Sequence, residues 1–233
     1  MSSAGAVPVR RAKQPRGEQT RGAIIDAALT LFTERGYDAT TMRAISESAG
    51  VSLGNAYYYF RSKDELVQGF YGRTAAEHGE RLPGVLAGVT GLAERLTAHL
   101  DLWFDLMAPQ HSFAVGFFRS AADPSSPLSP FSAASAPARD AAIGLMDLVV
   151  AGADPAVPDI VRSELPEVLW LYHMGVVLFW VHDRSVDQAA TRVLVRRTVP
   201  LIERVVGLAD LPALRGVMAD LAALLADLKV MAG

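Results

Sequence analysis

The chain has 233 residues, of which 51% are hydrophobic types, with no cysteine and a formal net charge of −3. This length and apolar content allow a sizeable buried core, and the lack of cysteine excludes disulfides, thiolate catalysis and cysteine metal sites. The longest apolar run, Met174 to Val181, is well below the ~20 residues of a membrane span, and no secretory signal is evident, so we expect a cytoplasmic protein.

Charge is distributed unevenly along the chain. Up to Lys63 there are nine Lys and Arg against five Asp and Glu, whereas the remainder has 13 against 20. Residues 1–19 are basic and show no periodicity, which predicts an unfolded arm. A basic N-terminal third followed by an acidic remainder is compatible with a nucleic-acid-binding segment despite the negative total.

From Thr20 the pattern becomes helical. Apolar residues at three-to-four spacing predict a first helix that stops at Gly36: Ile24, Ala27, Ala28, Leu31 and Phe32. Thr40 or Thr41 can cap a short second helix that ends at Gly50, and Ser52 can cap a third that ends near Tyr59. Ser62 and Glu65 have the spacing of a capping box, which predicts the start of a fourth helix.

Two short helices joined by a glycine turn and supported by a preceding helix are the arrangement of a helix-turn-helix. The third helix would then enter the DNA major groove. Ala56 and Phe60 are four apart and are predicted to face the core, which leaves a polar, tyrosine-rich side outward. Asn55 can read a base edge, and tyrosine hydroxyls can donate to phosphates. Adjacent tyrosines are also typical of a core or an interface, so the residues alone leave both interpretations open.

The stretch from Thr20 to Val67 resembles the DNA-binding domain of the TetR (tetracycline repressor) family. It has "LFTERGYDATT", "GVS" and "YYYF" followed by "SKDEL", in order and at the family's spacing. The resemblance implies an all-α homodimer with an N-terminal three-helix helix-turn-helix domain and a larger C-terminal domain that binds a ligand and dimerises. It divides the chain into an arm at residues 1–19, a DNA-binding domain at 20–66 and an effector-binding and dimerisation domain at 67–233.

The resemblance also implies which residues contact a two-fold symmetric double-stranded DNA operator. By position they are Thr41, Arg43, Ser52, Gly54, Asn55, Tyr57, Tyr58, Tyr59 and Lys63, the last as a phosphate-binding lysine. Leu53 and Tyr59 depart from the family pattern, in which many members carry a basic or small residue and a histidine. No operator sequence therefore follows, and the basic arm is left either to reach the DNA or to make no contact.

Beyond Leu66 the sequence predicts further helices. Residues 81–84 and Pro109 are expected to interrupt them, residues 123–137 to form a loop, and Pro200 to kink or split the segment that Asp187 begins. A last helix is expected to carry an apolar stripe from Leu214 to Leu228. No segment alternates with period two, so we expect no sheet.

Aromatic residues and methionines gather in this C-terminal region. Ordinary core packing explains each one, whereas an effector pocket would explain the group: Trp103, Phe104, Met107, Phe117, Trp170, His173 and Met174. Few charges stand among them, which indicates a small apolar or amphipathic effector. The helix 167–182 is apolar nearly all round, so we expect it, with residues 189–206, to form the dimer interface, rimmed by Arg196, Arg197, Glu203 and Arg204.

No catalytic or metal-binding constellation is evident. Walker, zincin, nucleophile-elbow and dinucleotide motifs are absent, and Asp101 and Asp105 are better explained as a solvated helix face. His78, His99 and His111 are scattered without partners at ligand spacing. We expect no enzyme, no metal and no cofactor. The sequence favours a ligand-responsive repressor that releases its operator on binding its effector; the alternative is a dimeric DNA-binding regulator without an effector.

Overall fold

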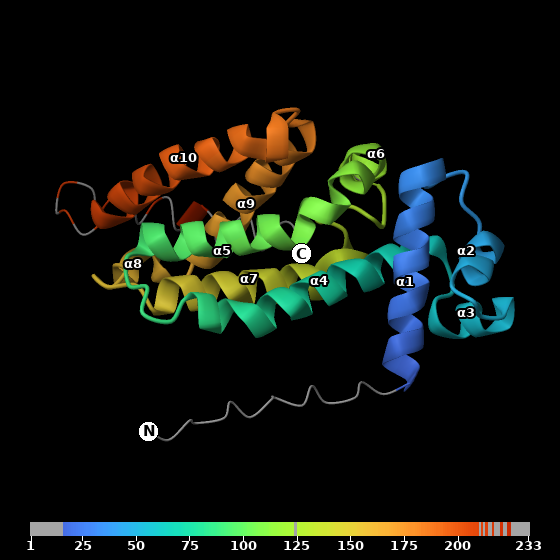
Figure 1. Ribbon diagram of the computed structural model, residues 1–233. Helices are drawn as coiled ribbons and strands as arrows, with labels where there is room; N and C mark the ends of the chain where they lie inside the picture. Colours follow the sequence, from blue (N-terminus) through green and yellow to red (C-terminus); the bar gives the residue numbers. More distant parts are fainter. Residues whose placement is uncertain are drawn as a thin grey trace, which may run out of the picture. The chain divides into compact units, whose positions relative to one another are not determined.

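The computed structural model describes residues 16–123 and 125–209, together with separate positions between 211 and 224. All regular elements in these residues are helical, with no strand among them, which confirms the predicted all-α class (Figure 1). The chain divides into two compact units between Leu66 and Val67. Residues 1–15 of the predicted arm, and most of the predicted last helix, lie outside the described residues.

The first unit contains α1 (Arg16–Arg35), α2 (Met42–Ser48) and α3 (Leu53–Tyr59). Helix α1 begins before the predicted start at Thr20, because Glu18 stabilises its first turn and the Thr20 hydroxyl donates to the main-chain oxygen of Arg16. Its apolar side is buried, and α2 packs against both α1 and α3. Gly36 and Gly50 have φ of +83° and +67°, so each takes the left-handed conformation that its turn requires.

Helix α4 (Lys63–Val85) crosses the division, and the second unit contains the remaining helices (Figure 1). In chain order these are α5 (Leu92–Met107), α6 (His111–Ala122), α7 (Ala136–Ala151), α8 (Asp159–Arg162), α9 (Leu165–His182) and α10 (Ala189–Gly207), with short 3₁₀ turns before α6, α7 and α10. Helix α5 runs alongside α7 and α10, and α9 packs against α6, α7 and α10.

The predicted break at residues 81–84 is wrong, and Pro200 does not split its helix. Helix α4 continues through Pro83 to Val85, with Leu82 and Leu86 buried on either side of the proline. Helix α10 likewise runs through Pro200, and its neighbour Val199 is fully buried. An internal proline costs about 3 kcal/mol, whereas each fully buried leucine or valine stabilises by about 1.5–3 kcal/mol. Packing beside each proline therefore outweighs the lost backbone hydrogen bond.

Among the described helices, α9 alone is long and apolar enough to cross a membrane by length and composition. Leu169, Trp170 and Trp180 are nevertheless buried against the other helices of the unit. This pattern is typical of a central core helix.

Two arginines join helices of the second unit. Arg95 on α5 is 8% exposed and donates to three main-chain oxygens, those of Val89, Leu148 and Val149. Arg192 on α10 donates to Asp101 at 2.9 Å and to Asp105 at 2.8 Å. Both carboxylates are therefore engaged in holding α5 to α10, which favours a structural role over acid–base chemistry.

Candidate functional site

The first unit holds α2 and α3 in a tight helix-turn-helix. The Thr41 hydroxyl accepts a hydrogen bond from the Ala44 amide at 3.2 Å, and the Ser52 hydroxyl accepts one from the Asn55 amide at 3.1 Å. Each helix thus has the side-chain N-cap that the sequence predicts. Between them, the Val51 amide donates to the oxygen of Ser46 and closes the turn over Gly50.

Helix α3 has one buried side and one open side. Ala56 and Phe60 are buried, as the spacing predicts, whereas Tyr57 is 47% and Tyr58 81% exposed. Tyr59 is half-buried, and its ring meets that of Tyr58 edge-on at 5.2 Å. The interpretation of all three tyrosines as core residues therefore fails for Tyr57 and Tyr58 within this chain.

The proposed DNA contacts lie within the first unit, on and beside α2 and α3. Most are exposed: Thr41, Arg43, Ser52, Gly54, Asn55, Tyr57 and Tyr58. Tyr59 and Lys63 are partly buried. The hydroxyls of Thr41 and Ser52 already serve as helix caps, so each has a structural role besides any contact it makes with DNA.

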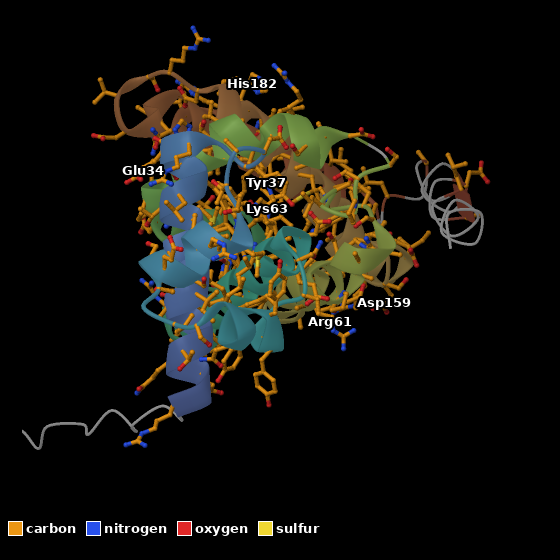
Figure 2. The ribbon with its side chains drawn as sticks, turned by 90° about the vertical axis from the view of Figure 1, so that its right-hand side faces the viewer. Glu34, Tyr37, Arg61, Lys63, Asp159 and His182 are labelled. Carbon is orange, nitrogen blue, oxygen red and sulfur yellow. The ribbon has the colours of Figure 1, made fainter. Side chains whose placement is uncertain are left out.

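Lys63 has an internal role that the sequence did not indicate. Its ammonium donates to the main-chain oxygens of Tyr37, at 2.6 Å, and Asp38, at 3.3 Å (Figure 2). The Tyr37 hydroxyl in turn donates to the Asp64 carboxylate, and burial together with this bond raises the pKa of Tyr37 well above its usual range. An ammonium has three N–H donors, so one remains for a phosphate.

The start of α4 is capped as predicted, with one difference. The Ser62 hydroxyl accepts a hydrogen bond from the Glu65 amide at 3.2 Å. The Glu65 carboxylate reaches back to the amide of Arg61, at 2.8 Å, rather than to that of Ser62. The reciprocal pair still fixes the turn between α3 and α4.

The second unit contains an apolar cavity with a volume of about 210 Å³, lined by residues of α4, α5, α6, α7 and α9. Six of the seven predicted pocket residues line it: Trp103, Met107, Phe117, Trp170, His173 and Met174. The assignment of Phe104 is wrong, because its ring is buried away from the cavity, 5.3 Å from the Arg192 guanidinium. Neighbouring residues on α5 point about 100° apart, so Trp103 reaches the cavity and Phe104 faces α10.

The contribution of α4 to the cavity was missed. Phe70, Tyr71, Thr74, Ala75 and His78 all line it. No aromatic cluster marks this helix in the sequence, since its lining side chains are mixed in size and polarity. The signal that could have been used is the recurrence of these positions at three-to-four spacing.

Three histidines from three helices meet at the cavity wall: His78 on α4, His99 on α5 and His173 on α9. The rings of His78 and His99 stack with centres 4.5 Å apart, and His173 meets His99 edge-on at 5.6 Å. The prediction that His78 and His99 are scattered is therefore wrong in space. Helix packing, rather than sequence spacing, brings them together.

Burial keeps these histidines uncharged. It lowers the pKa of His78 to about 4, assisted by the positive charge of Arg81, and that of His173 to about 3, assisted by His78. Burial, with His173 and His78 as neighbours, holds the pKa of His99 well below its usual value. Within the described residues, no group of three histidine or acidic side chains is arranged to hold a metal ion.

Two family models match the chain. The model described as "Bacterial regulatory proteins, tetR family" matches residues 24–69. The model described as "Tetracyclin repressor-like, C-terminal domain" matches residues 95–224, more than half of the chain. The chain belongs to the TetR family. The helix-turn-helix and the cavity described above are therefore those of a TetR-family transcriptional regulator.

Individual relatives show how far the similarity extends. The fatty acid metabolism regulator protein of Bacillus subtilis is 28% identical over 92 residues, which cover 40% of this chain and 47% of the relative. The regulator HbdR of Aromatoleum sp. (strain CIB) is 32% identical over 120 residues, 52% of each chain. The chain thus spans about half the length of these relatives.

A solved structure supports the fold beyond the DNA-binding unit. FadR from Bacillus subtilis, in complex with stearoyl-CoA, aligns with a TM-score of 0.62 at 19% identity. The alignment covers 76% of this chain and 96% of that one. At this identity the likeness establishes the TetR fold alone.

Proposed function

We propose that this TetR-family protein is a repressor that releases its operator when a small apolar or amphipathic effector enters the second unit. The observation that carries the proposal is the cavity among α4, α5, α6, α7 and α9, whose lining is predominantly aromatic and aliphatic. Its volume of about 210 Å³ exceeds the ~150 Å³ at which an apolar protein cavity admits benzene. The stearoyl-CoA held by the related FadR fold supports an effector with an apolar part.

Operator binding is assigned to the open side of α3. Asn55 supplies the amide that can read a base edge, and Gly54 allows the helix backbone to approach the groove closely. Tyr57, Tyr58 and Tyr59 supply hydroxyls for phosphates, as Arg43 and Lys63 supply charge. Thr41 and Ser52 complete the set at the N-termini of α2 and α3, where free amides favour phosphate oxygens.

Dimerisation is assigned to the outer faces of α9 and α10. Large apolar side chains are exposed there: Leu171, Leu178 and Phe179 on α9, Val193, Leu201 and Val205 on α10, and Leu208 directly after α10. Monomers rarely leave large contiguous apolar surfaces open. Exposed Arg196, Arg197 and Arg204 remain suitable rim residues. Glu203 is half-buried, and its carboxylate accepts a hydrogen bond from the Ala93 amide that caps α5, so it has a structural role besides a place at the rim.

Pairing would supply the specificity that one short helix lacks. Two recognition helices held about 34–36 Å apart read half-sites one turn apart on one face of DNA. Effector binding among the helices of the second unit would favour a dimer in which this separation is changed, and operator affinity would fall.

The test begins with selection of bound fragments from genomic DNA, which gives the half-site and its symmetry. Operator affinity is then measured by fluorescence anisotropy, with and without each member of a panel of apolar and amphipathic compounds. Binding of each compound is followed independently by thermal shift, since a ligand at 100 times its dissociation constant stabilises by about 2.7 kcal/mol. Compounds that stabilise the protein should weaken operator binding. If they stabilise it and leave operator affinity unchanged, the protein is a DNA-binding regulator that does not respond to the cavity.

A further inference from the structure

Three histidines that line the apolar cavity carry ring nitrogens whose hydrogen-bonding capacity is not met by the described residues. Four buried ring nitrogens have no hydrogen-bond partner among the described residues: Nε2 of His78, Nδ1 and Nε2 of His99, and Nε2 of His173. The three side chains are each less than 5% exposed, and all three line the cavity. A buried polar atom left without a partner costs about 1–3 kcal/mol, so a ligand group that pairs with one of these nitrogens would be favoured.

The rings of the three histidines do not supply hydrogen-bond partners for these four nitrogens. His78 and His99 lie nearly parallel, at an interplanar angle of 27°, so their edges do not face each other. His173 stands at 86° to His99 and at 90° to the ring of Trp103, 4.9 Å away. The contacts among these rings are therefore face and edge contacts of aromatic groups, and none of them supplies a hydrogen-bond partner to the four nitrogens.

A metal ion does not fit this arrangement. Two stacked imidazoles direct their nitrogens along parallel planes rather than toward a common point, and a zinc site needs ligands converging at about 2.0–2.1 Å. A bound organic molecule has no such requirement. It can pair with one or two of the nitrogens.

We propose that His78, His99 and His173 are the polar anchor of the effector site and recognise an uncharged hydroxyl or carbonyl group on an otherwise apolar ligand. The inference rests on the proposed function of the cavity as the effector site. A neutral imidazole offers one N–H donor and one nitrogen acceptor, so the cluster suits a hydroxyl, which both donates and accepts, and also a carbonyl, which accepts.

The charge around the cluster favours an uncharged group over a carboxylate. All three imidazoles are held neutral, since burial lowers their pKa values. Two cationic groups lie nearby: Arg81, on α4 like His78, and Arg139, which lines the cavity. The Arg139 guanidinium already donates to the main-chain oxygens of Pro130 and Ser132 at 3.0 and 3.1 Å. Both of these bonds come from Nη1, and at the histidine cluster itself an anionic head would be buried against neutral rings.

The test compares 4-ethylphenol with ethylbenzene, which differ only in the hydroxyl group, and includes 4-ethylbenzoate as the anionic arm. All three tryptophans of the chain line the cavity, so intrinsic fluorescence reports occupancy without a label. We expect the phenol to bind about 10-fold more tightly than ethylbenzene, and the benzoate to bind no better than ethylbenzene. Equal affinities for the phenol and ethylbenzene would overturn the inference while leaving an apolar effector site in place.

The variants His99→Leu and His99→Gln test whether a preference for 4-ethylphenol over ethylbenzene depends on the histidine cluster. His99→Leu removes both ring nitrogens, so the phenol should lose its advantage while ethylbenzene binds as before. His99→Gln keeps one donor and one acceptor, so it should retain part of the preference. Thermal melts establish that each variant is folded, and the comparison in the unaltered protein decides the matter if His99→Leu does not fold. Tighter binding of the benzoate contradicts the uncharged anchor. Binding of none of the three contradicts both the inference and the proposed effector class.

Discussion

The ammonium of Lys63 donates to the main-chain oxygen of Tyr37 at 2.6 Å and lies 4.4 Å from the centre of the same residue's ring. Tyr37 follows α1, and Lys63 begins α4, so this contact closes the chain segment that carries α2 and α3. The neighbouring bond from Tyr37 to Asp64 strengthens the closure. The lysine that the family resemblance assigns to a phosphate contact therefore also stabilises the helix-turn-helix formed by α2 and α3.

Replacing Lys63 by Met keeps the apolar stem and removes the charge. We expect the first unit to lose about 2 kcal/mol of unfolding free energy, because a charged donor to two main-chain oxygens and a cation–π contact are both lost. Urea denaturation of the full chain measures the change. Arg61→Met is the matched control, since Arg61 is exposed and precedes the same cap. Equal stability of the two variants would show that the contact contributes nothing.

Because one side of α3 is exposed, we expect substitutions there to weaken DNA binding without changing the stability of the protein. Tyr58→Phe and Asn55→Ala alter exposed side chains, so each should leave the free energy of unfolding within about 0.5 kcal/mol of the original value. Tyr58→Phe should weaken binding several-fold to every operator variant, through a lost phosphate contact. Asn55→Ala should cost about 1–3 kcal/mol and relax preference at one base position. Anisotropy titrations against single-base operator variants measure both, and unchanged affinity in both variants contradicts the assignment.

The helix-turn-helix could be predicted from the sequence because its caps and turns depend on nearby residues. The caps at Thr41, Ser52 and Ser62 and the left-handed glycines at positions 36 and 50 depend on neighbouring residues, which a single sequence displays. The cavity was predictable in part, because aromatic residues on α5, α6 and α9 are conspicuous. Its histidine wall was not, since His78, His99 and His173 are brought together only by the packing of three helices. Phe104 was wrongly assigned to the cavity for a related reason. An aromatic side chain suits the pocket, but the position of Phe104 around the axis of α5 turns it toward α10.

We expect even a conservative substitution of Arg95 to lower the free energy of unfolding. Its guanidinium joins α5 to the end of α7 through the oxygens of Leu148 and Val149 and to the preceding turn through Val89. A lysine cannot reproduce this fork, so Arg95→Lys should lower the free energy of unfolding by about 2–3 kcal/mol.

Gly152 tests the same site from the opposite side. A Cβ at this position would fall within the Arg95 guanidinium, so Gly152→Ala must displace a group that is held on three sides. We expect a destabilisation comparable to that of Arg95→Lys, measured by urea denaturation. Gly144→Ala is the control, because a Cβ on this glycine of α7 meets no atom within 4 Å. The two losses should not add in the double variant, since both disrupt one contact. Additive losses would contradict the shared site.

The buried histidines predict the pH dependence of stability. Their pKa values are lowered in the folded chain, to about 4 for His78 and about 3 for His173, whereas the unfolded chain titrates near 6.5. Below pH 6.5 the unfolded state therefore binds more protons, and stability falls as pH falls from about 6.5 toward 4. Each histidine contributes at most about 1.4 kcal/mol per pH unit to this loss.

Replacing His99 by Leu removes one of these groups, and with it two unpaired polar atoms. The stability of the His99→Leu variant relative to the original protein should therefore change little between pH 7.5 and 6.5 and improve as pH falls from 6.5 toward 5, as measured by urea denaturation at several pH values. Leu96→Ala is the control, because Leu96 is fully buried on the same helix and carries no proton. Its cost of about 2–5 kcal/mol should be the same at every pH. A difference between His99→Leu and the original protein that does not change with pH would mean that His99 is not held neutral by burial, and the uncharged character of the cavity wall would then be wrong as well.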